Sequence, residues 1–182
     1  MKKIVTFAVI GILVFLSNQS FGSHWKATNL TTTYNLGTTQ IDPTGYYWAK
    51  DNKYHIFYAE GSQFSARIWE LKNGTKYDIT RKARAPYAQY GIHAYTWDVD
   101  NTQHVVFARY GRIFEIYGGG TLYPTWWYKN DLTSSSGGAP SAWKYVFGYV
   151  SSNDNSQRII YYCKSNSHGN TVILDIVNKF GY

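Results

Sequence analysis

The chain has 182 residues, of which 44% are hydrophobic and 19% aromatic, with 7 Trp, 18 Tyr and 9 Phe. Lys and Arg outnumber Asp and Glu by 18 to 11, but the basic residues are scattered apart from Arg81, Lys82 and Arg84 in one loop. Nucleic-acid binding uses a clustered basic stripe, so this composition does not favour a nucleic-acid partner. The single cysteine, Cys163, excludes an internal disulfide, and we expect it to be a buried thiol.

The first 22 residues have the pattern of a secretory signal. Lys2 and Lys3 precede an apolar run over residues 4–16, which is too short to span a bilayer as a helix. Ser20 and Gly22 then place small residues at the −3 and −1 positions of a cleavage site. We expect a mature chain from residue 23 onward that is secreted or periplasmic and not inserted in a membrane. The alternative is an uncleaved N-terminal anchor.

Residues 23–182 predict an all-β domain with almost no helix. In the segment Tyr54–Tyr58 apolar side chains alternate between two faces, as in a half-buried strand. Turn residues recur at short intervals, among them Asn73-Gly74, the dipeptide preferred in type I′ hairpins, and Gly118-Gly119-Gly120.

One pattern occurs three times along the chain. Each copy opens with an Asn/Asp-aliphatic-Thr signature, continues to a tyrosine, and ends in a strand that carries an acid. The signature and tyrosine are separated by 17, 17 and 18 residues, and the copies begin 49 and 53 residues apart. The signatures start at Asn29, Asp78 and Asp131, the tyrosines are Tyr46, Tyr95 and Tyr149, and the acids are Glu70, Glu115 and Asp175.

A period of this length with several short strands predicts β-propeller blades, three repeats per chain, over about residues 25–77, 78–127 and 128–182. Three blades are too few for a closed ring, and unclosed end blades would expose apolar faces and strand edges. We therefore expect ring closure by a homo-oligomer, with a dimer giving six blades.

Several segments resemble bacterial β-propeller lectins that bind fucose. The string Trp127…Asn130-Asp131-Leu132-Thr133…Gly138-Ala139-Pro140 resembles their W-x-x-N-D-L-T…GAP segment. Asp42-Pro43-x-Gly45-Tyr46 resembles their D-P-x-G-Y turn, and Gln103–Phe107 with Ile113-x-Glu115-Ile116 resembles their paired strands. Copy one lacks the Ala-Pro, copy two lacks the Asp-Pro turn, and copy three ends in Asp175.

The resemblance implies a multivalent lectin for glycans on cell surfaces or glycoproteins, with fucose-type sugars as the first choice. In such lectins an acid, a basic residue and an aromatic side chain hold the sugar between blades. Stacking and charged hydrogen bonds are the devices that bind sugars. The candidate sugar-binding residues are Glu70, Glu115, Asp175, Arg109, Arg112, Trp25, Trp69, Trp97, Trp126 and Trp127, with Arg67, Arg158 and Trp48 as further options.

Each candidate also has a structural interpretation. Tryptophans of a β repeat belong to the core more often than to a ligand site, and the strand acids fit either role. The repeated signature fits a turn whose side chains satisfy backbone amides. His55 and His104 occupy equivalent strand positions and fit a structural role, and the histidines show no metal-ligand spacing. We expect no metal and no cofactor.

Two other functional classes remain open. A propeller glycoside hydrolase needs two opposed carboxylates at a set separation. The acids of this chain follow the repeat, whereas a catalytic pair would break its symmetry, so we expect no enzyme. The second alternative is a non-catalytic protein-interaction module.

Overall fold

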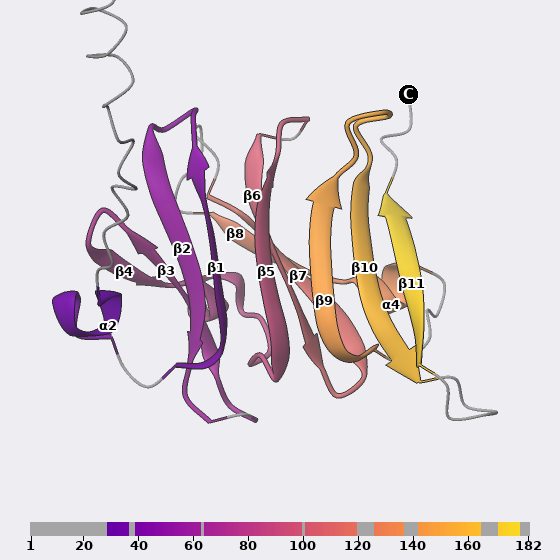
Figure 1. Ribbon diagram of the computed structural model, residues 1–182, viewed down its shortest axis with the longest axis horizontal. Helices are drawn as coiled ribbons and strands as arrows, with labels where there is room; N and C mark the ends of the chain where they lie inside the picture. The colour runs from indigo at the N-terminus through magenta and orange to yellow at the C-terminus, as the bar shows by residue number, and fades with distance from the viewer. Residues whose placement is uncertain are drawn as a thin grey trace, which may run out of the picture.

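The structure is a computed structural model that describes residues 29–36, 39–62, 64–99, 101–119, 126–136, 142–164 and 171–178. The described chain is all-β, which confirms the predicted fold class, and its strands form three antiparallel sheets of four, four and three strands. Figure 1 shows the sheets side by side in chain order.

Each sheet is a meander in which consecutive strands pair. The first sheet contains β1 (Thr39–Trp48), β2 (Lys53–Glu60), β3 (Arg67–Lys72) and β4 (Thr75–Asp78). The second contains β5 (Tyr90–Trp97), β6 (Thr102–Arg109), β7 (Arg112–Gly118) and β8 (Trp127–Asp131). The third contains β9 (Ala142–Val150), β10 (Gln157–Lys164) and β11 (Thr171–Asn178).

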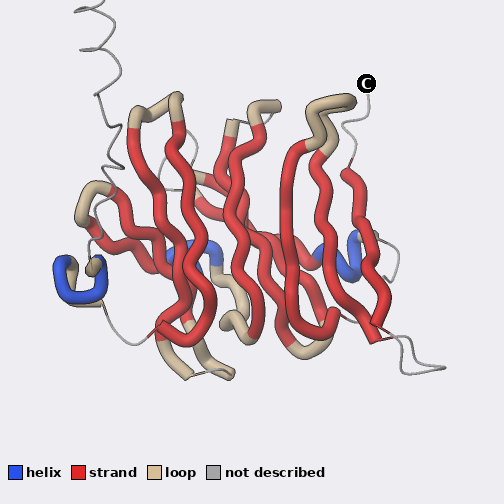
Figure 2. The backbone as a smooth tube through the Cα atoms, in the orientation of Figure 1, coloured by secondary structure: helices blue, strands red, loops and turns tan. Residues whose placement is uncertain are grey.

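The repeated signature forms single-turn helices, blue in Figure 2, rather than plain turns. These are α2 (Leu30–Thr33), α3 (Ile79–Ala83) and α4 (Leu132–Ser135). The predicted capping is confirmed, because the side chains of Asn29, Asp78 and Asp131 each accept a hydrogen bond from a backbone amide of the first turn. Among the described residues, no helix has the length and apolar character needed to cross a membrane.

The threonine of the signature ties two of these helices to their sheets. The Thr80 hydroxyl accepts a hydrogen bond from the Ile68 amide, and the Thr133 hydroxyl accepts one from the Ile113 amide, both at 2.7 Å. The signature therefore ends a sheet in the structure, since Asp78 and Asp131 are the last residues of β4 and β8. The sheets span residues 39–78, 90–131 and 142–178.

The second sheet is sandwiched between the other two. Strand β5 lies between β1 and β9 (Figure 1). Because side chains alternate along a strand, Val105 and Phe107 of β6 face the first sheet, whereas Val106 and Ala108 face the third. The thiol of Cys163 is free and buried in the second of these cores, as expected from the sequence.

The predicted Asn73-Gly74 turn is confirmed, whereas Gly118 of the predicted glycine turn is the last residue of β7. Asn73 and Gly74 join β3 to β4 with φ of 48° and 75°, the positive values that a type I′ turn needs at both central positions.

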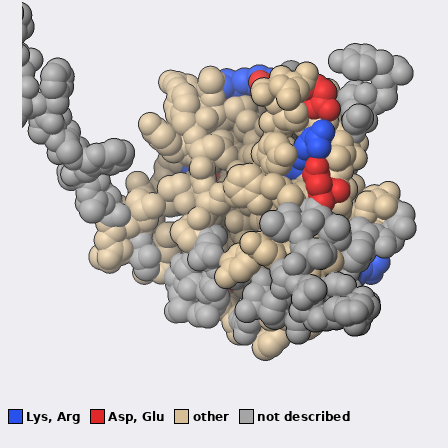
Figure 3. All heavy atoms as spheres, turned by 45° about the vertical axis from the view of Figure 1, so that its right-hand side comes forward, with Lys and Arg blue, Asp and Glu red and all other residues tan. Residues whose placement is uncertain are grey.

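Both ends of the stack are open, and the described residues form no closed ring. The third sheet turns Tyr145, Phe147 and Tyr162 to solvent, and the first sheet exposes Tyr47 and Tyr54. Figure 3 shows that the described surface on this side is mostly uncharged, apart from a group of acidic and basic side chains that lie next to one another.

Candidate functional site at the joints between the sheets

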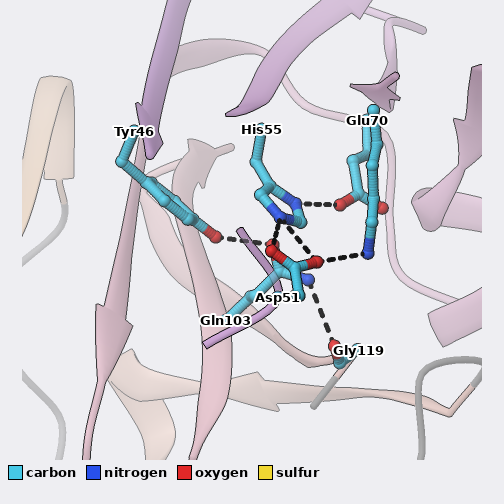
Figure 4. Close-up of polar contacts among 7 residues, drawn as sticks. Tyr46, Asp51, His55, Glu70, Gln103 and Gly119 are labelled. Carbon is cyan, nitrogen blue, oxygen red and sulfur yellow. Dashed lines mark hydrogen bonds and ion pairs between the residues drawn. The ribbon is translucent and has the colours of Figure 1, made fainter. Parts of the chain in front are cut away.

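A buried polar network joins the first sheet to the second. Tyr46 on β1 stacks on His55 of β2 with ring centroids 5.5 Å apart, and His55 Nδ1 lies 2.6 Å from Glu70 Oε1 on β3. The Tyr46 hydroxyl donates to Gln103 Oε1 on β6 at 2.7 Å (Figure 4). This bond crosses the contact between the first and second sheets, which we call the first joint; the contact between the second and third sheets is the second joint. We call Tyr46, His55, Glu70 and Gln103 the first network.

Charged groups surround this network. Asp51 contacts His55 Nε2 at 3.1 Å and Lys72 Nζ at 2.8 Å. Burial alone would raise the pKa of Asp51, but hydrogen bonds to Lys72 and His55 outweigh it and lower that pKa. Burial, followed by the charges of Glu70 and Asp51, raises the pKa of Tyr46 well above its ordinary value, so its hydroxyl stays a donor.

The second joint repeats the arrangement. Tyr95 stacks on His104 at 5.2 Å, and His104 Nδ1 lies 2.8 Å from Glu115 Oε1. Gln157 of the third sheet donates to the Tyr95 hydroxyl at 2.6 Å and to Glu115. Asn178 in turn donates to Gln157 Oε1 at 3.0 Å. These residues form the second network.

The two networks explain the strand acids of the first two copies. Glu70 and Glu115 are each only 4% exposed, and their carboxylates are held by buried histidines. A sugar would reach them only if the sheets separated, so this geometry favours a structural role. His55 and His104 are likewise buried, which confirms their structural interpretation.

The third copy keeps the pattern but not the burial. Arg158 stands where the other copies have histidine, and its Nη1 lies 2.8 Å from Asp175 Oδ2. This pair lies on the open face of the third sheet, beside Tyr149 on the neighbouring strand. Asp175 is therefore the solvent-accessible member of the three repeated acids.

A second link at each joint runs through the backbone. Thr44 Oγ1 accepts a hydrogen bond from the Ala94 amide, and His93 Nδ1 accepts one from the Gly148 amide, both at 3.3 Å. These acceptors occupy equivalent positions, two residues before Tyr46 and Tyr95.

The His93 link predicts a loss of stability in acid. Burial lowers the pKa of His93, so the folded protein favours the neutral ring that accepts this bond. The stabilisation is complete above the unfolded pKa of about 6.5 and is lost as pH falls through the lower folded pKa. His93→Thr keeps an acceptor, as Thr44 shows, but does not titrate. We expect urea midpoints below about pH 6.5 to fall more steeply for the wild type than for His93→Thr; parallel profiles would contradict the assignment.

The candidate tryptophans separate by exposure. Trp97 and Trp127 are buried; Trp97 donates to the Asn155 carbonyl at 3.0 Å, and Trp127 packs edge-on against Phe57. Trp69 is half-buried beneath Lys76 Nζ, which lies 4.2 Å from its ring. Trp126 is 55% exposed, and Trp25 lies outside the described residues.

The candidate arginines lie at the outer edges of the joints. Arg109 lies over the rings of Tyr87 and Tyr110, at 5.7 and 4.9 Å from the ring centroids. Arg112 Nη2 pairs with Asp131 at 2.9 Å and donates to the Ser134 hydroxyl at 2.6 Å.

An open pocket lies where the chain passes from the first sheet to the second. Its volume is about 260 Å³, room for one small group rather than for a long oligosaccharide. Thr80 and Ala85 are its less exposed members, and the others reach solvent. Sequence analysis named Arg67 as a possible sugar-binding residue and noted the basic cluster at Arg81 and Arg84. It did not single out Tyr87, which contacts Arg109 of β6 in the structure. The lining residues are Arg67, Thr80, Arg81, Arg84, Ala85 and Tyr87.

Within the parts of the chain that the structure describes, no group of three His, Cys, Asp or Glu side chains is arranged to hold a metal ion. Comparisons with protein-family models, with curated proteins and with solved structures gave no significant match.

Proposed function

We propose that this chain is a non-catalytic, secreted carbohydrate-binding protein, a lectin whose repeated sheets are the blades of a propeller. The observation that carries the proposal is the open pocket at the first joint, which combines guanidinium donors with a tyrosine ring. Polar donors beside an aromatic face are the combination that sugars require. Fucose-type glycans remain the first choice from the sequence resemblance.

The pocket's chemistry supports binding rather than hydrolysis. None of its lining residues is a carboxylate, whereas a glycosidase needs two that flank the scissile bond. The strand acids Glu70 and Glu115 are buried and engaged in the networks, which leaves them unsuited to act on a substrate.

The open ends of the stack support closure by a second copy. Tyr54 occupies the position that Gln103 and Gln157 hold in the two formed joints, yet it is 71% exposed, against 1% and 3% for the glutamines. On the third sheet, Phe147 occupies the position that the hydrogen-bond acceptors Thr44 and His93 hold in the first and second sheets. Both polar links are thus replaced by aromatic side chains at the open ends, which suits an apolar contact between the third sheet of one copy and the first sheet of another.

The edge of the third sheet supports the same partner. Strands β3 and β7 each pair with a fourth strand, whereas β11 has a neighbour on one side only among the described residues. Residues Trp25 to Asn29 repeat the spacing of β8, from Trp127 to Asp131, and likewise lead into a capped single-turn helix. We propose that this segment of a second copy supplies the missing strand.

A glycan array with the purified mature chain tests the function. We expect retention of a restricted set of glycans, strengthened by multivalency because single sugar sites are weak. Tyr87→Ala should weaken binding by about 1 kcal/mol or more, roughly five-fold. Tyr110→Ala is the matched control, since Tyr110 also lies under Arg109 but does not line the pocket. Folded wild-type protein that retains no glycan would remove the lectin proposal.

A further inference from the structure

The pocket at the first joint carries an excess of positive charge. Of its three arginines, Arg67 is balanced by Asp78, whose Oδ2 lies 3.2 Å from Arg67 Nη1. Arg81 and Arg84 take part in no ion pair with another described residue. Two guanidinium groups therefore remain available at the rim of an open pocket.

Arg84 also stands where the backbone disfavours it. It ends α3 in the left-handed region, with φ of 50° and ψ of 38°, a position usually taken by glycine or asparagine. The equivalent residues of the other repeats are Asn35, with φ of 49°, and Gly137. An arginine in a backbone conformation that disfavours it is an outlier that points to a role for its side chain.

The second joint lacks this excess. Arg112 is the counterpart of Arg67 and is balanced by Asp131, but the counterparts of Arg81 and Arg84 are Ser134 and Gly137. The two joints share their framework and differ in charge, so the extra arginines are not a requirement of the repeat.

We propose that the pocket lined by Arg67, Arg81, Arg84 and Tyr87 binds the anionic group of an acidic glycan, either the carboxylate of a sialic-acid-type sugar or a sulfate ester. This proposal rests on the carbohydrate-binding function proposed above. The planar guanidinium matches the oxygens of both anions with paired hydrogen bonds. Thr80 and Ala85 leave room for the group, and the exposed ring of Tyr87 offers a face to the attached sugar.

The test is titration calorimetry with glycans that share one core and are neutral, sialylated or sulfated, with inorganic sulfate as a further ligand. We expect at least one acidic form to bind about 10-fold or more tightly than the neutral form. That preference should decrease at high salt. The comparison of the sialylated and sulfated forms identifies which anion the pocket takes.

Arg84→Gly separates binding from folding. It should weaken binding of the acidic glycan by about 10-fold and binding of the neutral glycan by clearly less, so that the preference for the acidic form decreases. Its urea midpoint should equal or exceed that of the wild type, because glycine suits the left-handed backbone. Lys82→Ala is the control, since it removes the same charge from the same helix at a residue that lies over Tyr77 and does not line the pocket.

Three outcomes would overturn this inference. Equal binding of neutral and acidic glycans would do so while leaving the lectin proposal intact. Inorganic sulfate that binds as tightly as the sulfated glycan would reduce the pocket to a simple anion site. A wild type that binds none of the glycans would remove the proposed function together with this inference.

Discussion

Replacing Glu115 with alanine is expected to destabilise the folded protein by about 3–5 kcal/mol, the scale for breaking a buried charged pair by removing one partner. Glu115 holds His104 and receives hydrogen bonds from Tyr95 and Gln157, and these four side chains are buried together. The substitution leaves His104 without its carboxylate and removes the acceptor that ties the second sheet to the third. Urea unfolding followed by circular dichroism measures the loss.

The third copy supplies the matched control. Asp175 is the counterpart of Glu115 and pairs with Arg158, but on a face open to solvent. Exposed ion pairs are worth about 0–1 kcal/mol, so at protein concentrations where no second copy covers this face Asp175→Ala should change the free energy of unfolding by no more than that. Equal losses for the two variants would show that the second network is not what stabilises the joint.

Replacing Gly118 with alanine is expected to lower the free energy of unfolding by about 3–5 kcal/mol. Gly118 ends β7 with φ of +145°, a conformation that other residues rarely adopt. A methyl group there would lie 2.2 Å from the Trp126 carbonyl oxygen and 2.8 Å from Trp127 Cα. Both are backbone atoms, so the clash cannot be relieved by a side-chain rotation.

The clash would also disturb the first network, because the neighbouring residue Gly119 is hydrogen-bonded to Gln103. The Gly119 amide donates to the Trp126 carbonyl at 2.9 Å, and the Gly119 carbonyl accepts from Gln103 Nε2 at 3.3 Å. Gly74→Ala is the control, because Gly74 has φ of +75° but meets only the side chain of Tyr34. We expect Gly74→Ala to lower the free energy of unfolding by about 1–2 kcal/mol. A Gly118 variant no less stable than the Gly74 variant would contradict the close approach of the strands.

Local features of the fold were predictable because they depend on neighbouring residues. The Asn73-Gly74 hairpin and the capping of α3 by Asp78 follow from short-range backbone requirements. The repeat indicated similar units, but it did not show that the signature lies at the end of a sheet, where Thr80 and Thr133 bond to the amides of Ile68 and Ile113.

The roles of the repeated acids depend on tertiary packing. Glu115 and Asp175 occupy equivalent positions in the sequence, yet one is buried because a sheet covers it and the other is not. Trp97 and Trp127 are buried for the same reason, so the aromatic pattern alone could not separate stacking candidates from core residues. The pocket includes Tyr87, which lies between the first and second sheets and contacts Arg109 of β6.

We propose a ring of two copies that presents glycan sites where neighbouring sheets meet. The formed joints are polar networks, the open ends are aromatic, and β11 has a free edge among the described residues. If a second copy supplies both the missing strand and the missing face, assembly and binding should be observed in the same particle.

Native mass spectrometry of the mature chain, with and without the glycan selected by the array, measures both properties at once. We expect a particle of twice the chain mass that gains the mass of more than one glycan. A particle of single-chain mass that gains no glycan at micromolar protein concentration would contradict this expectation.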